Sequence, residues 1–354
     1  MARHGTQKTF IFLALSTVLA GWQCNAEPAK PYSYKQLVKQ TQFDPKKHQH
    51  IIEKVESILA NKESVGSYLQ KKQAIRWRKK IEAILREHGL SDENIDLIWY
   101  EHQRLIETRQ NRKETNKQIN LPPALISRVE RQLKQRGLDP TRIQLGTAKT
   151  KEARAKTKLL DDERECIEKL KLNHKKLLSY PDECFDAAIN HEAAHLSKHD
   201  MLLRILLDEF DRQGVIKITQ ACRTAVYRIQ EHCADYQAAD TLTNARALRA
   251  LIVAWYRKYG SSHFFSDRSE HPSPWKRFCK INKSILLFNA EQYLKTGCVP
   301  VTPPFPHYKM GAADYLRAHQ KSLFGIIAIS SVLGIALYAS HETGWWNAIP
   351  KTKL

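Results

Sequence analysis

The stretch that decides the fold is Ala187-Ala188-Ile189-Asn190-His191-Glu192-Ala193-Ala194-His195, which contains the pattern His-Glu-x-x-His. On a helix, residues four apart lie on one face with Cβ atoms ~5–6 Å apart. His191 and His195 can therefore converge on one Zn²⁺ with bonds of about 2.0–2.1 Å. Glu192 is turned by about 100° from His191 and flanks the open ligand position, where it can take a proton from zinc-bound water. The pattern predicts a hydrolytic metal centre.

A second helical segment offers the third protein ligand that such a centre needs. Glu231-His232-Cys233-Ala234-Asp235 lies in the helical run from Thr219 to Leu242, and Glu231 and Asp235 are one turn apart on one face. We expect Glu231 to bind zinc, which leaves the fourth position for water. We expect Asp235 to accept the outer N–H of a ligand histidine and so fix its tautomer. The two segments together predict one Zn²⁺ per chain; the rival metal ligands are His199, His232 and the pair His48/His50.

Hydrophobic spacing predicts that most of the body is helical. Apolar residues recur at helical intervals in 48–60 and 73–88, in a helix that Ser91 caps, and in one that Pro122-Pro123 opens and Gly137 ends. Strand-like segments are confined to 142–145, 156–160 and 166–172, and the helical pattern returns from 181 to 294. We therefore predict an α+β fold that is mostly α, with a small sheet before residue 180.

The charge of the chain is strongly positive but uneven. The 354 residues carry 57 Lys+Arg and 37 Asp+Glu, a net charge of +20. Residues 30–160 hold 29 of the basic and 15 of the acidic residues, a net of +14. Basic helix faces of this kind can bind anionic lipid or nucleic acid. Solvated faces of a helical domain explain them as well, and no nucleic-acid motif is present, so we expect no nucleic acid partner.

Both ends of the chain are apolar. Residues 1–26 combine a basic, acid-free start, a short apolar run and the small-residue segment Cys24-Asn25-Ala26, which is the order of a secretory signal peptide. Residues 322–339 are uncharged and apolar and are followed by Trp345 and Trp346, which predicts a membrane span. We expect a membrane-anchored protein whose catalytic body lies outside the cytoplasm, in the periplasm or its equivalent. The mitochondrial inner membrane is the alternative location.

These features predict six segments along the chain. They are a signal peptide (1–26), a basic helical region (27–140), a zinc metallopeptidase domain (141–298), a Pro-rich linker (299–321), the transmembrane helix (322–339) and a tail (340–354). Of the seven cysteines, removal of the signal leaves six, an even number that permits three disulfides outside the cytoplasm; the alternative is that they stay buried and reduced. Cys222 and Cys233 cannot bridge each other, because eleven residues along one helix separate them by roughly 16 Å.

The paired motifs resemble those of gluzincin metalloendopeptidases, in the group that contains the HtpX-type heat-shock proteases, the mitochondrial Oma-type protease and the CAAX prenyl endopeptidases (metallopeptidase family forty-eight). The resemblance covers roughly residues 122–292 and includes Asp200, the element Glu270-His271-Pro272-Ser273, and Arg277. It implies a zincin-like fold, zinc on His191, His195 and Glu231, and Glu192 as base. It also implies that His271 binds the oxyanion or a substrate carbonyl.

The sequence departs from that group in three places. The pair inside the zinc motif is Ala193-Ala194, where larger residues and Gly are common. The Asn-Ala edge strand that often precedes the zinc helix has Ala153-Arg154-Ala155 as its nearest match, and the apolar span lies at the C-terminus. We expect a membrane-anchored zinc endopeptidase that cleaves a peptide or protein substrate. The alternatives are a weakly active zinc-containing chaperone or adaptor that binds proteins through its basic helices, and an anionic-lipid or nucleic-acid binder with accidental motifs.

Overall fold

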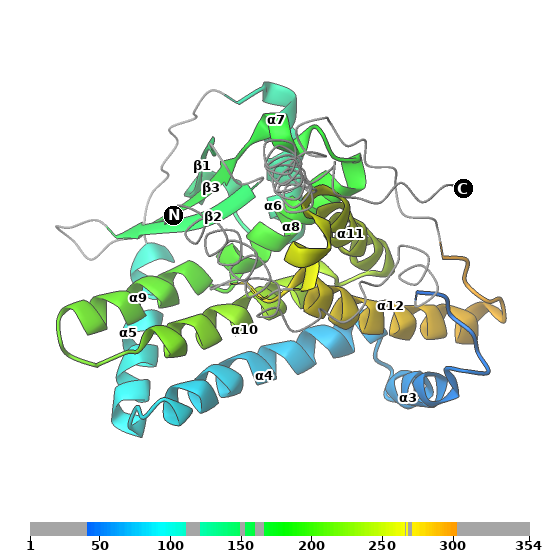
Figure 1. Cartoon of the computed structure of the whole chain (residues 1–354), viewed down its shortest axis with the longest axis horizontal. Coiled ribbons are helices and arrows are strands. Elements are labelled where there is room, and N and C mark those ends of the chain that lie inside the picture. The colour runs from blue at the N-terminus through cyan, green and yellow to red at the C-terminus, as the bar shows by residue number, and fades with distance from the viewer. Residues whose placement is uncertain are drawn as a thin grey trace, which may run out of the picture. The chain divides into compact units, whose positions relative to one another are not determined.

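A computed structural model describes residues 41–110, 121–148, 153–159, 166–265, 267 and 271–302 of the chain. Figure 1 shows the elements and their labels. The helices are α3 (Gln49–Ala60), α4 (Val65–Glu87), α5 (Asp92–Gln110), α6 (Pro123–Gln135), η1 (Pro140–Arg142), α7 (His174–Leu177), α8 (Asp182–Ser197), α9 (Asp200–Arg212), α10 (Gln220–Ala238), α11 (Leu242–Phe265) and α12 (Pro274–Thr296). The strands are β1 (Ile143–Thr147), β2 (Ala153–Leu159) and β3 (Cys166–Leu172).

The described strands form one small sheet in the order β1-β3-β2. β1 runs parallel to β3, whereas β2 runs antiparallel to β3 with Ala155 opposite Leu170. Successive side chains alternate between the two faces of a strand. One face carries Ala155, Leu170 and Leu172, all at most 1% exposed, and packs inward. The predicted α+β architecture, mostly α, with a small sheet before residue 180, is confirmed.

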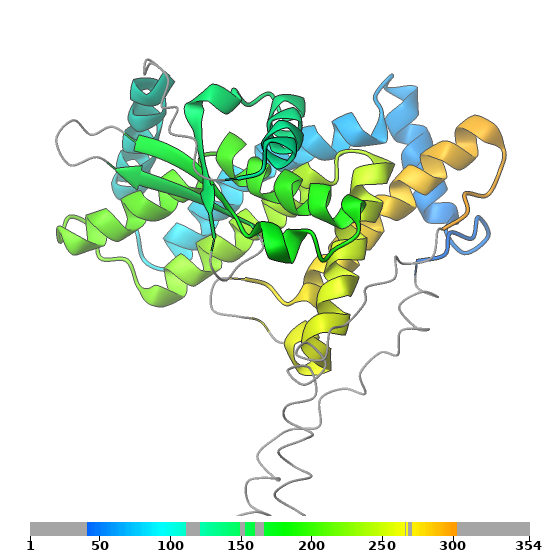
Figure 2. The ribbon, with the colours of Figure 1, turned by 90° about the horizontal axis from the view of Figure 1, so that it is seen from above.

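Helix α8 lies at the centre of the described structure. It packs against α10, α11, α6 and strand β2, and Figure 2 shows it beside the sheet. Its buried positions include four alanines, which keep the helix narrow enough for neighbours to approach on several sides: Ala187, Ala188, Ala193 and Ala194. Pro181 precedes its first turn, and Asp182 and Glu183 there favour the positive end of the helix dipole.

The N-terminal helices pack against the helices that follow the sheet. α4 lies along α10 and contacts α12, α3 packs on α12, and α5 packs on α9 (Figure 1). The apolar positions of α4 and α5 join those of α9 and α10 in one core cluster, which contains Ile81, Ile98, Leu203 and Val226. The basic helices therefore contribute buried side chains to the same core as α10.

Five described cysteines are free thiols: Cys184, Cys222, Cys233, Cys279 and Cys298. The three disulfides that an even cysteine count permits are therefore not formed by these five, and the alternative of reduced thiols describes them. The first three are buried among the core helices, where they pack as small apolar side chains. Burial raises the pKa of the Cys184 and Cys233 thiols to about 12, which keeps them protonated and unreactive.

Several predicted segments fall outside the described residues. These are the signal peptide (1–26), the membrane span (322–339), the tail (340–354) and most of the linker. Within the described ranges, no helix combines the length and the apolar character that crossing a membrane requires.

Candidate metal centre

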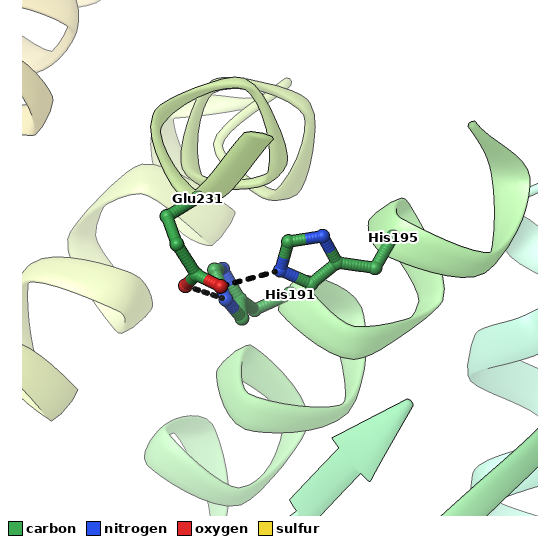
Figure 3. A group of neighbouring side chains, drawn as sticks. All are labelled: His191, His195 and Glu231. Carbon is green, nitrogen blue, oxygen red and sulfur yellow. Dashed lines mark ion pairs between the residues drawn. The ribbon is translucent and has the colours of Figure 1, made fainter. Parts of the chain in front are cut away.

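Two helices bring three metal-binding side chains together. α8 supplies His191 and His195, whose rings lie nearly perpendicular with centroids 4.8 Å apart, and α10 supplies Glu231. The Nε2 of His191 is 3.3 Å from Oε2 of Glu231, and the Nε2 of His195 is 3.4 Å from Oε1 (Figure 3). A tetrahedral site with bonds of about 2.0–2.1 Å places its ligand atoms roughly 3.3 Å apart. The three side chains are all buried and have the spacing of a metal-binding group.

A carboxylate behind each histidine turns its Nε2 toward this group. The Nδ1 of His191 is 3.0 Å from Oδ1 of Asp235, and the Nδ1 of His195 is 2.8 Å from Oδ2 of Asp200. An imidazole that donates from Nδ1 carries its lone pair on Nε2, which is the form that binds a metal. When neutral, both histidines therefore favour the tautomer that a metal centre needs, and the residue types fit zinc.

Asp200 reaches His195 because the chain turns sharply after α8. His199 has a left-handed backbone conformation, with φ of 53°, and starts α9 directly behind the C-terminus of α8. Histidine is among the non-glycine residues that enter this region more often than others. Its ring Nδ1 lies 2.9 Å from Oε1 of Glu168 on β3, which attaches the turn to the sheet. His199 therefore has a structural role in this turn and is not part of the three-residue group.

Arg277 forms an ion pair with Asp235 at the site. Its Nε and Nη2 donate to the two oxygens of Asp235 at 2.7 and 2.5 Å, in a bidentate pair that is almost fully buried. The guanidinium also lies over the Trp255 ring at 5.0 Å. Bidentate pairing fixes the orientation of the carboxylate as well as its position, and this holds Asp235 against His191.

Arg204 on α9 is a further partner of the site. Its Nη2 donates to Oε1 of Glu231 at 3.1 Å, and its Nε donates to Gln230 at 2.7 Å. The amide of Gln230 in turn donates to the backbone oxygen of Asp200 at 3.1 Å. The guanidinium lies over the Tyr227 ring at 4.5 Å. These contacts connect the Glu231 carboxylate to the start of α9.

Glu192 faces the sheet. Its Oε2 accepts a short hydrogen bond from the backbone N–H of Ala155 on β2. Glu192 is partly exposed, whereas His191 and His195 are buried. The carboxylate therefore contacts β2, and Glu192 follows His191 directly on α8.

The structure also places the remaining candidates. His271 lies beside the group, with Nδ1 3.1 Å from Oε2 of Glu231 and its side chain 31% exposed. His232 lies on α10 and is not in the metal-binding group. His48 bonds the backbone of Asp44 at the start of α3, and His50 is exposed on that helix.

The charges of neighbouring side chains shift the pKa values of the buried groups. Burial alone lowers the pKa of His195, but the charge of Glu231 and the hydrogen bond with Asp200 outweigh it and raise the pKa to about 10. Burial raises the pKa of Glu231, but the neighbouring histidines, His195 first, bring it well below its usual range. The charge of Arg277 overcomes burial in the same way and holds the pKa of Asp235 below its usual range.

Sequence reasoning did not identify Arg204 or Gln230. Neither belongs to a motif, and both contacts depend on how α9 packs against α10. Asp200 and Arg277 were noted only through the family resemblance, without a role. Their positions after His195 and after the His-Pro element were the signals that could have assigned one.

No protein-family model, curated protein or solved structure matches this chain. The function therefore has to be argued from the site itself.

Proposed function

We propose that this chain is a zinc-dependent metalloendopeptidase. The observation that carries the proposal is the place of Glu192, which follows His191 of the buried His191-His195-Glu231 group on α8 and bonds the edge strand β2. Peptide hydrolysis at a metal centre needs three things in one place: a metal that polarises the carbonyl, a base, and a surface that holds an extended peptide. The site offers residues for each.

The metal would be held by the Nε2 atoms of His191 and His195 and by the carboxylate of Glu231. Two nitrogens and one oxygen are a donor set of catalytic zinc sites, and three protein ligands leave a position open for water or substrate. When bound, zinc supplies Lewis acidity, which makes water more acidic and the scissile carbonyl more electrophilic. Asp235 and Asp200 would keep the two imidazoles aimed at it.

Glu192 would serve as general base and then as general acid. Its carboxylate takes the proton of the attacking water, and it passes that proton to the amine that leaves when the C–N bond breaks. His271 is close to Glu231 yet partly exposed, so we propose that it donates a hydrogen bond to the oxygen on which negative charge develops.

β2 is the proposed substrate strand. Among the described strands it has a neighbour on one side only, and the N–H of Ala155 points away from that neighbour toward Glu192. An unpaired strand edge can add an extended peptide as a further strand through main-chain hydrogen bonds, and such a peptide would take the Ala155 N–H from Glu192. A peptide held there passes directly by the proposed base. This arrangement is what we expect of a zincin-like fold.

The decisive experiment replaces Glu192 by Gln. We expect Glu192→Gln to keep stoichiometric zinc, measured by atomic absorption, and to lose hydrolysis of a quenched fluorescent peptide. The reason is that the amide preserves shape but cannot accept the proton. The matched control is Glu183→Gln, which changes an exposed glutamate on the first turn of the same helix. It should keep both zinc and activity.

Two results would contradict the proposal. Loss of zinc from a folded Glu192→Gln protein would make Glu192 a ligand rather than the base. Unchanged peptide hydrolysis would remove the carboxylate from the mechanism. The alternative function, a zinc-containing chaperone or adaptor, predicts that client binding survives in Glu192→Gln and that the parent protein cleaves no peptide.

A further inference from the structure

Five residues form a closed ring of contacts on one side of the metal-binding group. Arg204 donates from Nη2 to Oε1 of Glu231 at 3.1 Å and from Nε to the side-chain oxygen of Gln230 at 2.7 Å. The amide nitrogen of Gln230 donates to the backbone oxygen of Asp200 at 3.1 Å, and the Asp200 carboxylate lies 2.8 Å from Nδ1 of His195. The contact ring closes where Nε2 of His195 lies 3.4 Å from the same Oε1 of Glu231 (Figure 3).

The contact ring is buried, and its partners fit in one geometry. Gln230 is 0% exposed and Asp200 is 1% exposed, while the side chain of Arg204 is 14% exposed. The amide of Gln230 accepts from Arg204 and donates to Asp200, so only one orientation of this amide satisfies both partners. The aromatic ring of Tyr227 lies 4.5 Å from the guanidinium of Arg204 and stacks with it. A planar guanidinium held in this way fixes the position of the oxygen to which it donates, here Oε1 of Glu231.

The charge of Arg204 alone does not favour a metal ion at this site. A guanidinium that donates to a ligand carboxylate lies close to the ion that the carboxylate binds, and two positive charges repel each other. The contact with Glu231 therefore suits a residue that positions the carboxylate better than one that attracts the metal.

We infer that Arg204 and Gln230 are positioning residues, which hold Glu231 and His195 in register before a metal ion binds. The third ligand, His191, contacts the other oxygen of Glu231 and is not part of the contact ring. The inference rests on the proposed function in one respect, because it takes the same group as the metal site. It adds the residues that keep two of the three ligands aligned.

Arg204→Met tests the inference, because it removes the donors and keeps an unbranched side chain. Zinc affinity of the full-length protein is measured by competition with a chromophoric chelator. Loss of a partner that orients a metal ligand typically costs about 10–100-fold in affinity or activity, so zinc binding should weaken by that factor. Loss of a repelling charge alone would leave the affinity unchanged or raise it. Unchanged or tighter zinc binding in folded Arg204→Met would therefore overturn the inference.

Two further variants open the same contact ring in other ways. Gln230→Met removes no charge and should also weaken zinc binding. The double variant Arg204→Met/Gln230→Met should bind zinc about as weakly as the weaker single variant, because either substitution already opens the ring; losses that multiply would overturn the ring as a unit. Arg204→Lys keeps the charge without the planar fork and should restore only part of the affinity. Full restoration would assign the effect to charge and overturn the positioning role.

Cobalt provides a readout that a loss of stability alone does not change. The visible absorption of Co²⁺ bound in place of zinc depends on the geometry of its ligands. At saturating Co²⁺, Arg204→Met and Gln230→Met should differ from the parent in band position or intensity, and identical spectra would contradict the inference. Arg223→Met is the matched control, because Arg223 also joins α10 to α9, through ion pairs with Asp208 and Asp211. It should keep the parent spectrum and zinc affinity, and circular dichroism establishes that each variant is folded.

Peptide hydrolysis, measured in parallel, separates this inference from the proposed function. A parent protein that binds zinc but cleaves no peptide, with weakened zinc binding in Arg204→Met and Gln230→Met, would support the positioning role and refute the peptidase proposal. Hydrolysis by the parent together with unchanged zinc affinity in both variants would overturn the inference and leave the peptidase proposal standing.

Discussion

Replacing Asp235 by Asn tests whether a buried ion pair holds the metal centre together. Asp235 accepts two hydrogen bonds from Arg277 and lies 3.0 Å from Nδ1 of His191, and both members of the pair are at most 6% exposed. The amide removes the charge and leaves a buried guanidinium without a counter-ion. Breaking such a pair from one side costs about 3–5 kcal/mol. At about 2–4 °C per kcal/mol for a domain of this size, the melting temperature should fall by about 6–20 °C.

The same substitution should weaken metal binding independently of stability. Loss of the partner that orients a ligand histidine typically costs about 10–100-fold in metal affinity or activity. Zinc affinity is measured by competition with a chromophoric chelator and stability by calorimetry of the metal-free protein. Asp208→Asn is the control, because its pair with Arg223 is on the surface and is worth at most about 1 kcal/mol.

A second variant separates the two effects. Arg277→Met in the Asp235→Asn background removes the stranded charge, so stability should partly return while zinc affinity stays low. Unchanged melting temperature and unchanged zinc affinity in a folded Asp235→Asn protein would refute the reasoning about this pair.

Three further predictions concern the ligands and the thiols. Glu231→Ala should purify without zinc while Glu183→Ala keeps it, and full zinc occupancy in folded Glu231→Ala would remove Glu231 from the ligand set. His195 is protonated at pH 7 in the metal-free protein, so zinc should release protons, seen as buffer-dependent heats in calorimetry. Its raised pKa contributes stability that is complete below about 6.5 and is lost as the pH rises toward about 10. The metal-free melting temperature should therefore fall across that window, and a flat profile would show that His195 is neutral. Thiol labelling of unfolded, non-reduced protein should find at least five reactive cysteines; fewer would mean that disulfides form among them. In the folded protein Cys184 and Cys233 should react slowly at pH 7, because burial raises their thiol pKa values.

Helices and strands were predicted well wherever the spacing of apolar residues along the sequence determines them. The three strands and the helices α3, α5 and α6 lie close to the expected positions, and Ser91 accepts a hydrogen bond from the N–H of Asn94 as a cap should. The start of α4 was missed by eight residues. Ser64 caps it, but Gly66 in its first turn disfavours helix in the sequence. A Cβ at Gly66 would lie 2.6 Å from the backbone oxygen of Asp240, so this glycine lets α4 approach the end of α10.

The residues of the candidate site also differ in how far the sequence alone predicts them. His191 and His195 are brought together by helical spacing within one element, which a sequence displays directly. Glu231 comes from a second helix, and only the pairing of two motifs pointed to it. Arg204 has no local signature, because its contact with Glu231 exists only through the packing of α9 on α10. The role of Asp200 depends on the left-handed turn at His199, which no periodicity predicts.

The balance of buried charge explains why these residues suit a divalent cation. Three buried carboxylates lie beside the histidines, and guanidinium groups pair with two of them: Glu231 pairs with Arg204 and Asp235 with Arg277, while Asp200 contacts His195. With neutral histidines, these groups carry three negative and two positive charges, and a low-dielectric interior disfavours the excess negative charge. In the metal-free protein this charge favours protonated histidines, and this is why the pKa values of His191 and His195 are raised despite burial. A divalent cation supplies positive charge in place of these protons, with both imidazoles neutral and able to bind it. Protons and a metal ion therefore compete for the same two imidazoles, and the site exchanges one for the other as the pH changes.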